Sequence, residues 1–599
     1  MSQLLCAAET VLVALSHAAG RSAAHHPAID DKVPILLTAL MVAAVLVRVV
    51  FGTKGAEKPP AEDSQPLLLL PSDDRLPSET ERDAGLVKIR GRDPGFSVET
   101  LLERAGRVFV AVEKAITRGD VASVRALMTD AAYQQFKARL SLAGVFGVRP
   151  AVADVTPTGV RVSALEVAGR HDGAHVGIQF EARRTEVPVG TSAAAALEAA
   201  SSAPAVAGAE VWSFLRRQGT KTTAAGVIEG LCPSCGAVFQ GGETGECAYC
   251  HAIVNSGAFD WVLAKISEVD AFSVRGAVAP GLANLVVRDS DCGAEIIENR
   301  AVLLFWRTIE ALATEDAGRL KKVARPKVTA GLQDRFELDR SDGLREWYRD
   351  VQLMSVDLVA VDGDAGASDL AHVRVRWRGE HGLGSRDAPA ATRRVERAHV
   401  LVLGRRHGAR TDQDLGMLTF RCWSCHAPLS DSDSTRCDFC QADQVDDGDH
   451  WRLESFESND LWLARRGQSD TASATELGMF GRQRLFKLMV ALARADGQIT
   501  ADEREALEQR GEALGLRPDL IQEGLRDTDL QRADFPKPEE AVPFLAELVE
   551  LAKADGEVTS DERTFLDRMA RSMEATPGDL QHLLDAEAQP VQASSRLGP

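Results

Sequence analysis

The chain has 599 residues, a formal net charge of −19 and an apolar fraction of 45%. This length exceeds what one hydrophobic core supports, so three or four domains are expected, and the apolar fraction is ample for globular folding. Because the negative charge repels polyanions from the surface as a whole, the composition argues against a nucleic-acid-binding protein.

The N-terminal region predicts a membrane anchor and a tether. Residues 33–51 are almost entirely apolar, and a helix of that length, at ~1.5 Å per residue, crosses a hydrocarbon core. Basic residues follow this segment, so the positive-inside rule places residues 1–32 outside and the bulk of the chain in the cytoplasm. A buried core helix is the competing interpretation. Residues 52–92 are polar and Pro-rich, which predicts a disordered tether.

Residues 4–19 leave the topology open. They are apolar but contain Glu9, and no Lys or Arg precedes them, which is typical neither of a signal peptide nor of a first span. If they did cross the membrane, a hairpin would leave both ends of the chain in the cytoplasm.

Two segments, 93–265 and 290–462, each predict helices first and strands afterwards. Apolar residues keep helical spacing at the start of each segment, and alternating patterns follow. This order predicts an α+β module with helices on one face of a curved antiparallel sheet. Strands are expected at 160–168, 174–184, 353–362 and 371–378.

The two segments also repeat each other. Trp261 recurs as Trp451 at an offset of 190, and the run 216–219 recurs at 405–408. The economical interpretation is two copies of one module that differ in loop length. Within the first copy, the Ala/Ser-rich stretch 189–209 is predicted to be a flexible loop.

Eight of the ten cysteines form two C-x2-C-x11-C-x2-C clusters, one within 230–252 and the other within 420–442. Two CxxC turns complete a tetrahedron around zinc, and four thiolates leave no open position, so the sites are expected to be structural. Disulfide-stapled loops in an exported protein are the alternative, but paired CxxC turns are far commoner as metal sites, and the reducing cytoplasm predicted after residue 51 agrees with zinc. The predicted ligands of the two zinc ions are Cys232, Cys235, Cys247, Cys250, Cys422, Cys425, Cys437 and Cys440.

The first module carries further local features. Asp93-Pro94-Gly95-Phe96 precedes its first helix, Gly119-Asp120 separates the first helix from the second, and Thr129-Asp130 precedes Tyr133 and Phe136. These features resemble the C-terminal domain of the mitochondrial import-motor scaffold (Tim forty-four) and its bacterial relatives.

The resemblance covers most of 93–262 and, more weakly, 296–462, where Glu315 replaces Gly119. It implies a cystatin-like α+β fold with an apolar pocket, used to bind or scaffold other molecules rather than to catalyse a reaction. The ordinary members of that family lack the cysteine clusters, so each cluster looks inserted before the closing segment at Trp261 or Trp451.

After a linker at 463–476, residues 477–585 predict an all-α bundle, and residues 586–599 a loose tail. The run 493–503 recurs 59 residues later at 552–562. In each copy a threonine and a glutamate three residues later form a capping box that starts a helix.

The paired acidic runs resemble the tellurite-resistance TerB-like domain, in which acidic residues of the two halves can hold a divalent cation. This resemblance implies a second metal site at Asp496, Glu503, Asp555 and Glu562. The alternative is purely structural, because the capping boxes already explain Glu503 and Glu562.

No catalytic motif is present: the sequence has no glycine-rich phosphate loop, no H-E-x-x-H and no nucleophile elbow. His171 and His175 are expected in a solvated turn. The chain is therefore predicted to be a membrane-anchored scaffold that binds protein segments or lipid, not an enzyme. The alternatives are an envelope- or metal-stress component whose TerB-like domain senses a divalent ion, and an enzyme hidden in a cystatin-like pocket.

Overall fold

The computed structural model describes residues 78–586, with gaps at 224, 241–244, 273–277, 364–366, 388–391, 413–414, 416, 433, 446–447, 467–477, 496, 498, 527–529, 531–534, 537–540 and 555–557. The predicted span 33–51, residues 4–19 and the first part of the predicted tether lie outside this range. Among the helices that are described, none is both long and apolar enough to cross a membrane.

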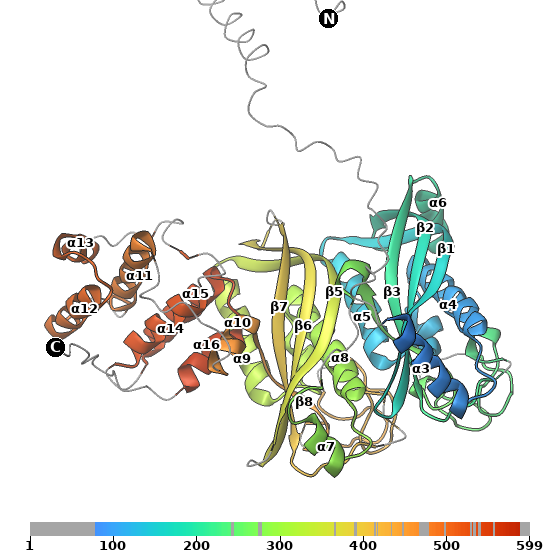
Figure 1. The fold of residues 1–599 in the computed structure, drawn as a ribbon. Helices are drawn as coiled ribbons and strands as arrows, with labels where there is room; N and C mark the ends of the chain where they lie inside the picture. Colours follow the sequence, from blue (N-terminus) through green and yellow to red (C-terminus); the bar gives the residue numbers. More distant parts are fainter. Residues whose placement is uncertain are drawn as a thin grey trace, which may run out of the picture. The chain divides into compact units, whose positions relative to one another are not determined.

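The first module has a four-stranded antiparallel sheet in the order β1-β2-β3-β4, with helices that precede the strands (Figure 1). Its core centres on Phe109, whose ring centroid lies 4.9 Å from that of Phe180 and 5.2 Å from that of Trp212. The helices are α3 (Glu79–Arg92), α4 (Val98–Arg118), η2 (Val121–Leu127), α5 (Asp130–Val145), α6 (Ala193–Ser201), η3 (Val227–Glu229), η4 (Val254–Ser256) and η5 (Val269–Ala271), and the strands are β1 (Val148–Ala168), β2 (His171–Pro188), β3 (Ala205–Arg217) and β4 (Val262–Glu268).

The second module repeats this order, with a sheet β5-β6-β7-β8. Phe305 is fully buried at the centre of its core, 6.4 Å between ring centroids from Trp377. The elements are α7 (Leu282–Arg288), α8 (Ala294–Thr314), η6 (Ala317–Leu320), α9 (Pro326–Ser341), β5 (Leu344–Asp362), β6 (Ser368–Ser385), β7 (Arg393–Arg406), β8 (Arg452–Ser458) and α10 (Asn459–Arg465).

The helices that open the two modules match in length and in how they end. Both α4 and α8 have 21 residues, and each is followed by a residue in the left-handed region, Gly119 at φ 69° and Glu315 at φ 52°. This backbone conformation is less favourable for a glutamate than for a glycine, because the glutamate has a Cβ atom. The carboxylate of Glu315 accepts hydrogen bonds from both terminal nitrogens of Arg386, at 2.7 and 2.6 Å, which holds the strained turn in place.

The expected strands 160–168, 174–184, 353–362 and 371–378 all lie inside observed strands, which are longer. Strands β1 and β5 each change register against their partners at three places. Such irregularities bend and twist a strand. They account for the curvature expected of these sheets.

Two predictions for the first module are wrong. Residues 79–92 of the expected tether form α3, capped by Ser78, and Ile89 is fully buried. Residues 193–201 of the expected flexible loop form α6, and Ala196 and Ala200 pack against alanines of β1. The physical reason is that alanine has the highest helix propensity and its small side chain allows a helix to approach a strand closely.

The two modules pack on each other through α5 and α8, which Figure 1 shows side by side. The amide of Gln134 on α5 donates to Glu310 on α8 at 2.8 Å, and Arg307 donates to the Gln134 carbonyl oxygen at 3.2 Å. All three side chains are buried. The interface therefore has a polar centre whose groups are satisfied across the two modules.

The C-terminal region is helical, as expected. Its core includes Phe486 and Leu548, and its last helix packs on the second module, where the hydroxyl of Thr576 donates to the carbonyl oxygen of Phe456 at 2.8 Å. The helices are α11 (Met479–Leu492), α12 (Ala501–Ala513), α13 (Pro518–Gly524), α14 (Ala541–Ala552), α15 (Ser560–Ser572) and α16 (Pro577–Asp585).

Candidate metal centres

Each CxxC pair of the first cluster lies on a tight turn closed by an isolated β-bridge. In the first turn, the amide of Cys232 donates to the carbonyl oxygen of Ala237 and the amide of Gly236 donates to that of Cys232, both at 2.8 Å. Gly236 has φ 75°, and His251 occupies the same left-handed position in the second turn with φ 59°. These turns aim the two cysteine side chains of each pair in the same direction.

The four sulfur atoms of the first cluster face one another. The distance between Sγ atoms is 3.7 Å for Cys232 and Cys250 and 3.8 Å for Cys235 and Cys247, and all four lie within 4.8 Å of one another. A disulfide would need about 2.0 Å. A tetrahedral zinc site with Zn–S bonds of ~2.3 Å has sulfur–sulfur edges of about 3.8 Å. The donor set therefore fits a tetrahedral metal ion and not two disulfides.

The second cluster has the same geometry. Its Sγ atoms are 3.6 Å apart for Cys422 and Cys440 and 3.7 Å apart for Cys425 and Cys437. The side-chain amide of Gln444 also donates to Cys422 Sγ at 3.3 Å. A hydrogen bond of this kind stabilises a thiolate and orients it toward a metal.

The environment of the thiols favours partial ionisation. Hydrogen bonds from the backbone amides of Cys250 and Tyr249 lower the pKa of Cys247 to about 6, and the amide of Ala442 lowers that of Cys440 to about 7. Burial raises the pKa of Cys232 to about 12. Cys247 and Cys440 can therefore supply thiolates near neutral pH, whereas Cys232 needs a bound cation to become anionic.

Both clusters are anchored to their modules by their buried cysteines. Cys232 and Cys247 are buried, whereas Cys235 and Cys250 are exposed, and the second cluster has the same alternation. Cys232 packs with Ala126 of η2 in a small apolar cluster. A metal ion at either cluster would therefore fix a long loop against the module from which it emerges.

A buried ion pair ties the start of each module to its cysteine-bearing loop. Arg216 Nη1 donates to Asp93 Oδ2 at 2.9 Å, and its guanidinium carbon lies 4.6 Å from the ring centroid of Trp261. Asp93 also accepts from the hydroxyl of Thr222 at 2.6 Å. The sequence repeat pointed to Arg216 and Trp261, but not to their carboxylate partner.

The same arrangement recurs in the second module. Arg405 Nη1 lies 2.9 Å from Asp289 Oδ2, and its guanidinium carbon lies 4.5 Å from the ring centroid of Trp451. The hydroxyl of Thr411 donates to the same carboxylate at 2.7 Å. Asp93 and Asp289 are 196 residues apart, and the starts of helices α4 and α8 are separated by the same number. A complete comparison of the two repeats could therefore have found these two carboxylates.

Of the four acidic candidates in the C-terminal region, Asp496 and Asp555 lie outside the described residues. Glu503 accepts hydrogen bonds from the backbone amide of Thr500 at 2.6 Å, and Glu562 from that of Thr559 at 2.9 Å. Both glutamates therefore complete the capping boxes that the sequence predicted.

The expectation of a solvated turn at His171 and His175 is wrong. Both are buried, with 5% and 6% of their surface exposed. His175 lies between Ser213, with 2.8 Å between Nδ1 and the hydroxyl oxygen, and Glu166, at 3.1 Å from Nε2. The physical reason is that β2 already begins at His171, so both histidines are in the sheet rather than before it.

Residues 82–225 match the model of the Tim44-like domain family. Searches of curated proteins and of solved structures find no match for the chain. The family match begins within α3, runs through the helices and the first three strands of the first module, and ends before the first cysteine of the first cluster. It supports the resemblance that the residues around Asp93, Gly119 and Thr129 indicated.

Proposed function

We propose that this protein is a scaffold or binding protein of a bacterial inner membrane, in which two α+β modules bind protein segments or lipid. The single observation that carries the binding role is the Tim44-like match over residues 82–225. A fold family supports such a role by analogy, because function resides in particular sites. The close packing of α5 against α8 supports the idea that the two modules act as one platform.

The two cysteine clusters would each hold a structural zinc ion. Their sulfur–sulfur distances of 3.6 to 3.8 Å support a tetrahedral ion, and four thiolates leave no position for water or substrate. When bound, zinc would supply cross-links between the two turns of each loop. The residues of the chain supply the ligands and the hydrogen bonds that orient them.

In this proposal residues 33–51 anchor the protein, and everything after residue 51 faces the reducing cytoplasm. The apolar composition of that segment and the eight reduced thiols support this topology. It is tested by separating membranes from soluble protein, for the full chain and for a chain that starts at residue 78. The full chain should stay with the membranes after alkaline carbonate washing and the shortened one should not, while equal behaviour of the two would contradict the anchor.

The zinc prediction is tested by elemental analysis of the purified full chain. We expect two zinc ions per chain, and one in each of the variants Cys232→Ser and Cys422→Ser. Cys292→Ser is the matched control, because Cys292 is a buried thiol outside both clusters and should leave the zinc content at two. A chain without zinc, or one whose eight thiols are oxidised in pairs, would contradict both the zinc sites and the cytoplasmic topology.

The binding role is tested with the chain that starts at residue 78, against extended peptides and against vesicles. Saturable binding of either, lost when a chelator removes the metal, would support a platform held in shape by zinc. Absence of binding to both would contradict the scaffold proposal without affecting the zinc result.

A further inference from the structure

The cysteine-bearing loop of the second module lies against helix α5 of the first module. The backbone amide of Phe420 donates to Asp130 Oδ2 at 3.0 Å, and Arg421 Nε lies 3.7 Å from the same oxygen. Asp130 is the first residue of α5 and is only 2% exposed. A buried carboxylate of the first module is therefore contacted by the two residues that come directly before Cys422, a predicted zinc ligand.

A second point of contact lies between the two CxxC turns of this loop. One carboxylate oxygen of Asp431 forms an ion pair with Lys137 of α5, and the other lies 2.9 Å from Arg307 Nη1 of α8. Arg307 also donates to Gln134 of α5 at 3.2 Å, and its guanidinium carbon lies 4.2 Å from the ring centroid of Phe420. Asp431 therefore joins helices of both modules beside the polar centre of their interface.

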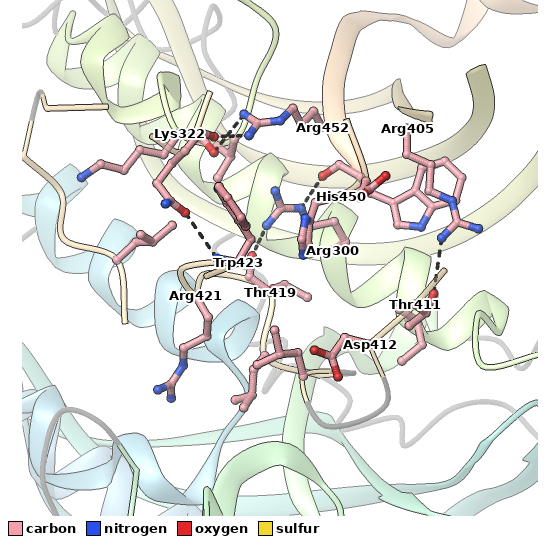
Figure 2. Close-up of a pocket in the computed structure, with 18 of the residues that line it drawn as sticks. Arg300, Lys322, Arg405, Thr411, Asp412, Thr419, Arg421, Trp423, His450 and Arg452 are labelled. Atoms are coloured by element: carbon pink, nitrogen blue, oxygen red, sulfur yellow. Dashed lines mark hydrogen bonds between the residues drawn. The ribbon is translucent and has the colours of Figure 1, made fainter. Parts of the chain in front are cut away.

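The same loop is fastened to its own module. Arg300 of α8 donates to the carbonyl oxygen of Thr419 (Figure 2), and the ammonium group of Lys322 donates to the carbonyl oxygen of Ser430 at 2.7 Å. Leu429 packs on the core cluster of the second module. These contacts are next in sequence to those made with the first module, so the loop is held from both sides.

A metal ion at the second cluster would fix both points of contact in one position. Its four ligands lie on two turns, and the segment 426–436, which carries Asp431, connects these turns. With the ion bound, both ends of this segment are tied to one atom. Without it, holding the segment in a single conformation costs more entropy. The metal–ligand bonds would therefore stabilise the position of Asp431 between the two helices.

The first cluster carries different residues at the positions that make these contacts. At the offset of 190 that relates the two clusters, Phe420, Arg421 and Asp431 correspond to Gly230, Leu231 and Gly241. The first cluster is anchored at η2 of its own module, where Asn255 donates to the carbonyl oxygen of Met128 at 3.0 Å and Cys232 packs with Ala126. Its metal ion would therefore act within the first module.

The residues of α5 that receive the loop also differ from their counterparts in the second module. Helices α5 and α9 both have 16 residues, and their starts are 196 residues apart. At this offset Asp130 corresponds to Pro326 and Lys137 to Gln333. The complementary groups are thus found on the two surfaces that meet, and the equivalent positions of the repeat carry other residues.

From this asymmetry we infer that the second cysteine cluster is a metal-dependent clamp between the two modules, whereas the first cluster stabilises its own module. Loading of the second site would hold α5 against α8, and loss of its metal would let the modules open along this interface. The inference rests on the proposed zinc sites and does not depend on the binding role or on the membrane anchor.

The test measures amide hydrogen exchange of the purified full chain and follows peptides from α5 and α8 by mass spectrometry. The decisive variant is Asp431→Asn, which keeps every cysteine but removes the charge that pairs with Lys137 and Arg307. It should retain two zinc ions and exchange the amides of α5 and α8 about tenfold faster than the parent, which corresponds to ~1.4 kcal/mol of local stability.

The matched control is Asp449→Asn, which makes the same change in a carboxylate that follows the second cluster. Asp449 pairs with Arg406 of the second module at 2.5 Å. This variant should leave the exchange of α5 and α8 unchanged.

The variants Cys425→Ser and Cys235→Ser separate the two clusters, because these exposed cysteines occupy the same position in each. Each substitution should lower the zinc content from two to one. Cys425→Ser should also speed exchange in α5 and α8, whereas Cys235→Ser should speed it in η2 and leave α5 and α8 as they are in the parent.

Three results would overturn the clamp: Asp431→Asn exchanges like the parent, Asp449→Asn speeds exchange equally, or the two cysteine variants affect α5 and α8 alike. With two zinc ions in the parent chain, any of these results rejects the clamp and leaves the zinc sites standing. A parent chain without zinc rejects both.

Discussion

Arg405 and Asp289 form an ion pair in which each residue is only 1% exposed. Replacing Arg405 with leucine leaves the buried Asp289 carboxylate without its cation, although it still accepts hydrogen bonds from the amide and the hydroxyl of Thr411. Loss of one partner of a buried pair typically costs about 3–5 kcal/mol. We therefore expect Arg405→Leu to lower the temperature of the first unfolding transition clearly.

The double variant Arg405→Leu with Asp289→Leu is the matched control for this prediction. It removes both charges, and buried pairs replaced by apolar residues often lose little stability. Recovery of most of the loss in the double variant would show that the cost arises from the unpaired carboxylate. An unfolding temperature for Arg405→Leu equal to that of the parent would contradict the structural role of the pair.

At the scale of single residues, the sequence predicted the cysteine ligands but not the environment of the histidines. The cysteines were predictable because their spacing is local and is imposed by the metal geometry. The burial of His175 depends on Ser213 of the neighbouring strand and Glu166 of the preceding one, and no local pattern reports such contacts. For the same reason Asp289 was missed: its partner Arg405 lies 116 residues away.

At the scale of elements, the capping boxes can be separated from a cation site. Thr559→Ala removes the side chain that accepts from Glu562 and should cost about 1 kcal/mol of stability in the C-terminal helices. Thr500→Ala, the matched change at α12, should cost a similar amount. Thermal unfolding of the parent and of both variants, with and without added magnesium, calcium or manganese, checks this prediction.

If Glu503 and Glu562 serve only as caps, divalent ions leave the unfolding of the C-terminal helices unchanged in all three proteins. A rise in the unfolding temperature with one of these ions, reduced by Glu562→Gln, would contradict a purely structural role. It would favour the acidic site implied by the TerB-like resemblance.

The two helices that were not predicted from the sequence, α3 and α6, share one property. Helices α3 and α6 have few large apolar residues, so their patterns looked like those of a tether and a loop. Each is stabilised by one face only: Ile89 of α3 and Ala196 of α6 are fully buried. Helices that depend on a docking surface for their stability carry a weak local signal, whereas α4, with its wide apolar stripe, was evident.

At the scale of the whole chain, the contact between the second module and α16 includes a carboxylate whose ionisation should affect stability. Glu457 on β8 is fully buried, 2.7 Å from Arg465 and 3.5 Å from His582 of α16. Burial raises the pKa of Glu457 from its usual value of 4.5 to about 7. Between these two pH values the folded protein therefore holds a proton on Glu457 that the unfolded chain has already released.

A carboxyl group with a raised pKa stabilises the fold fully below the pKa of the unfolded chain and loses that contribution as pH rises through its pKa in the folded state. The contribution of Glu457 should thus decline between about pH 4.5 and pH 7. His582 acts in the opposite direction, because burial lowers its pKa to about 4 and its contribution is lost as pH falls below about 6.5. The dependence of the parent protein's stability on pH combines the two effects, so the contribution of Glu457 must be separated by a substitution.

The variant Glu457→Gln isolates this effect because it fixes a neutral side chain of nearly the same shape. Relative to the parent, the Gln variant should be more stable. This gain should grow between pH 5 and pH 7.5 to the order of 1–3 kcal/mol, since one pKa unit corresponds to ~1.4 kcal/mol. The carboxylate of Asp579, also buried at this contact, helps to raise the pKa of Glu457, so its repulsion is part of the difference that this comparison measures. Thermal unfolding of the two proteins at several pH values measures the difference. A difference that stays constant with pH would mean that Glu457 is ionised throughout and that Arg465 compensates for its burial.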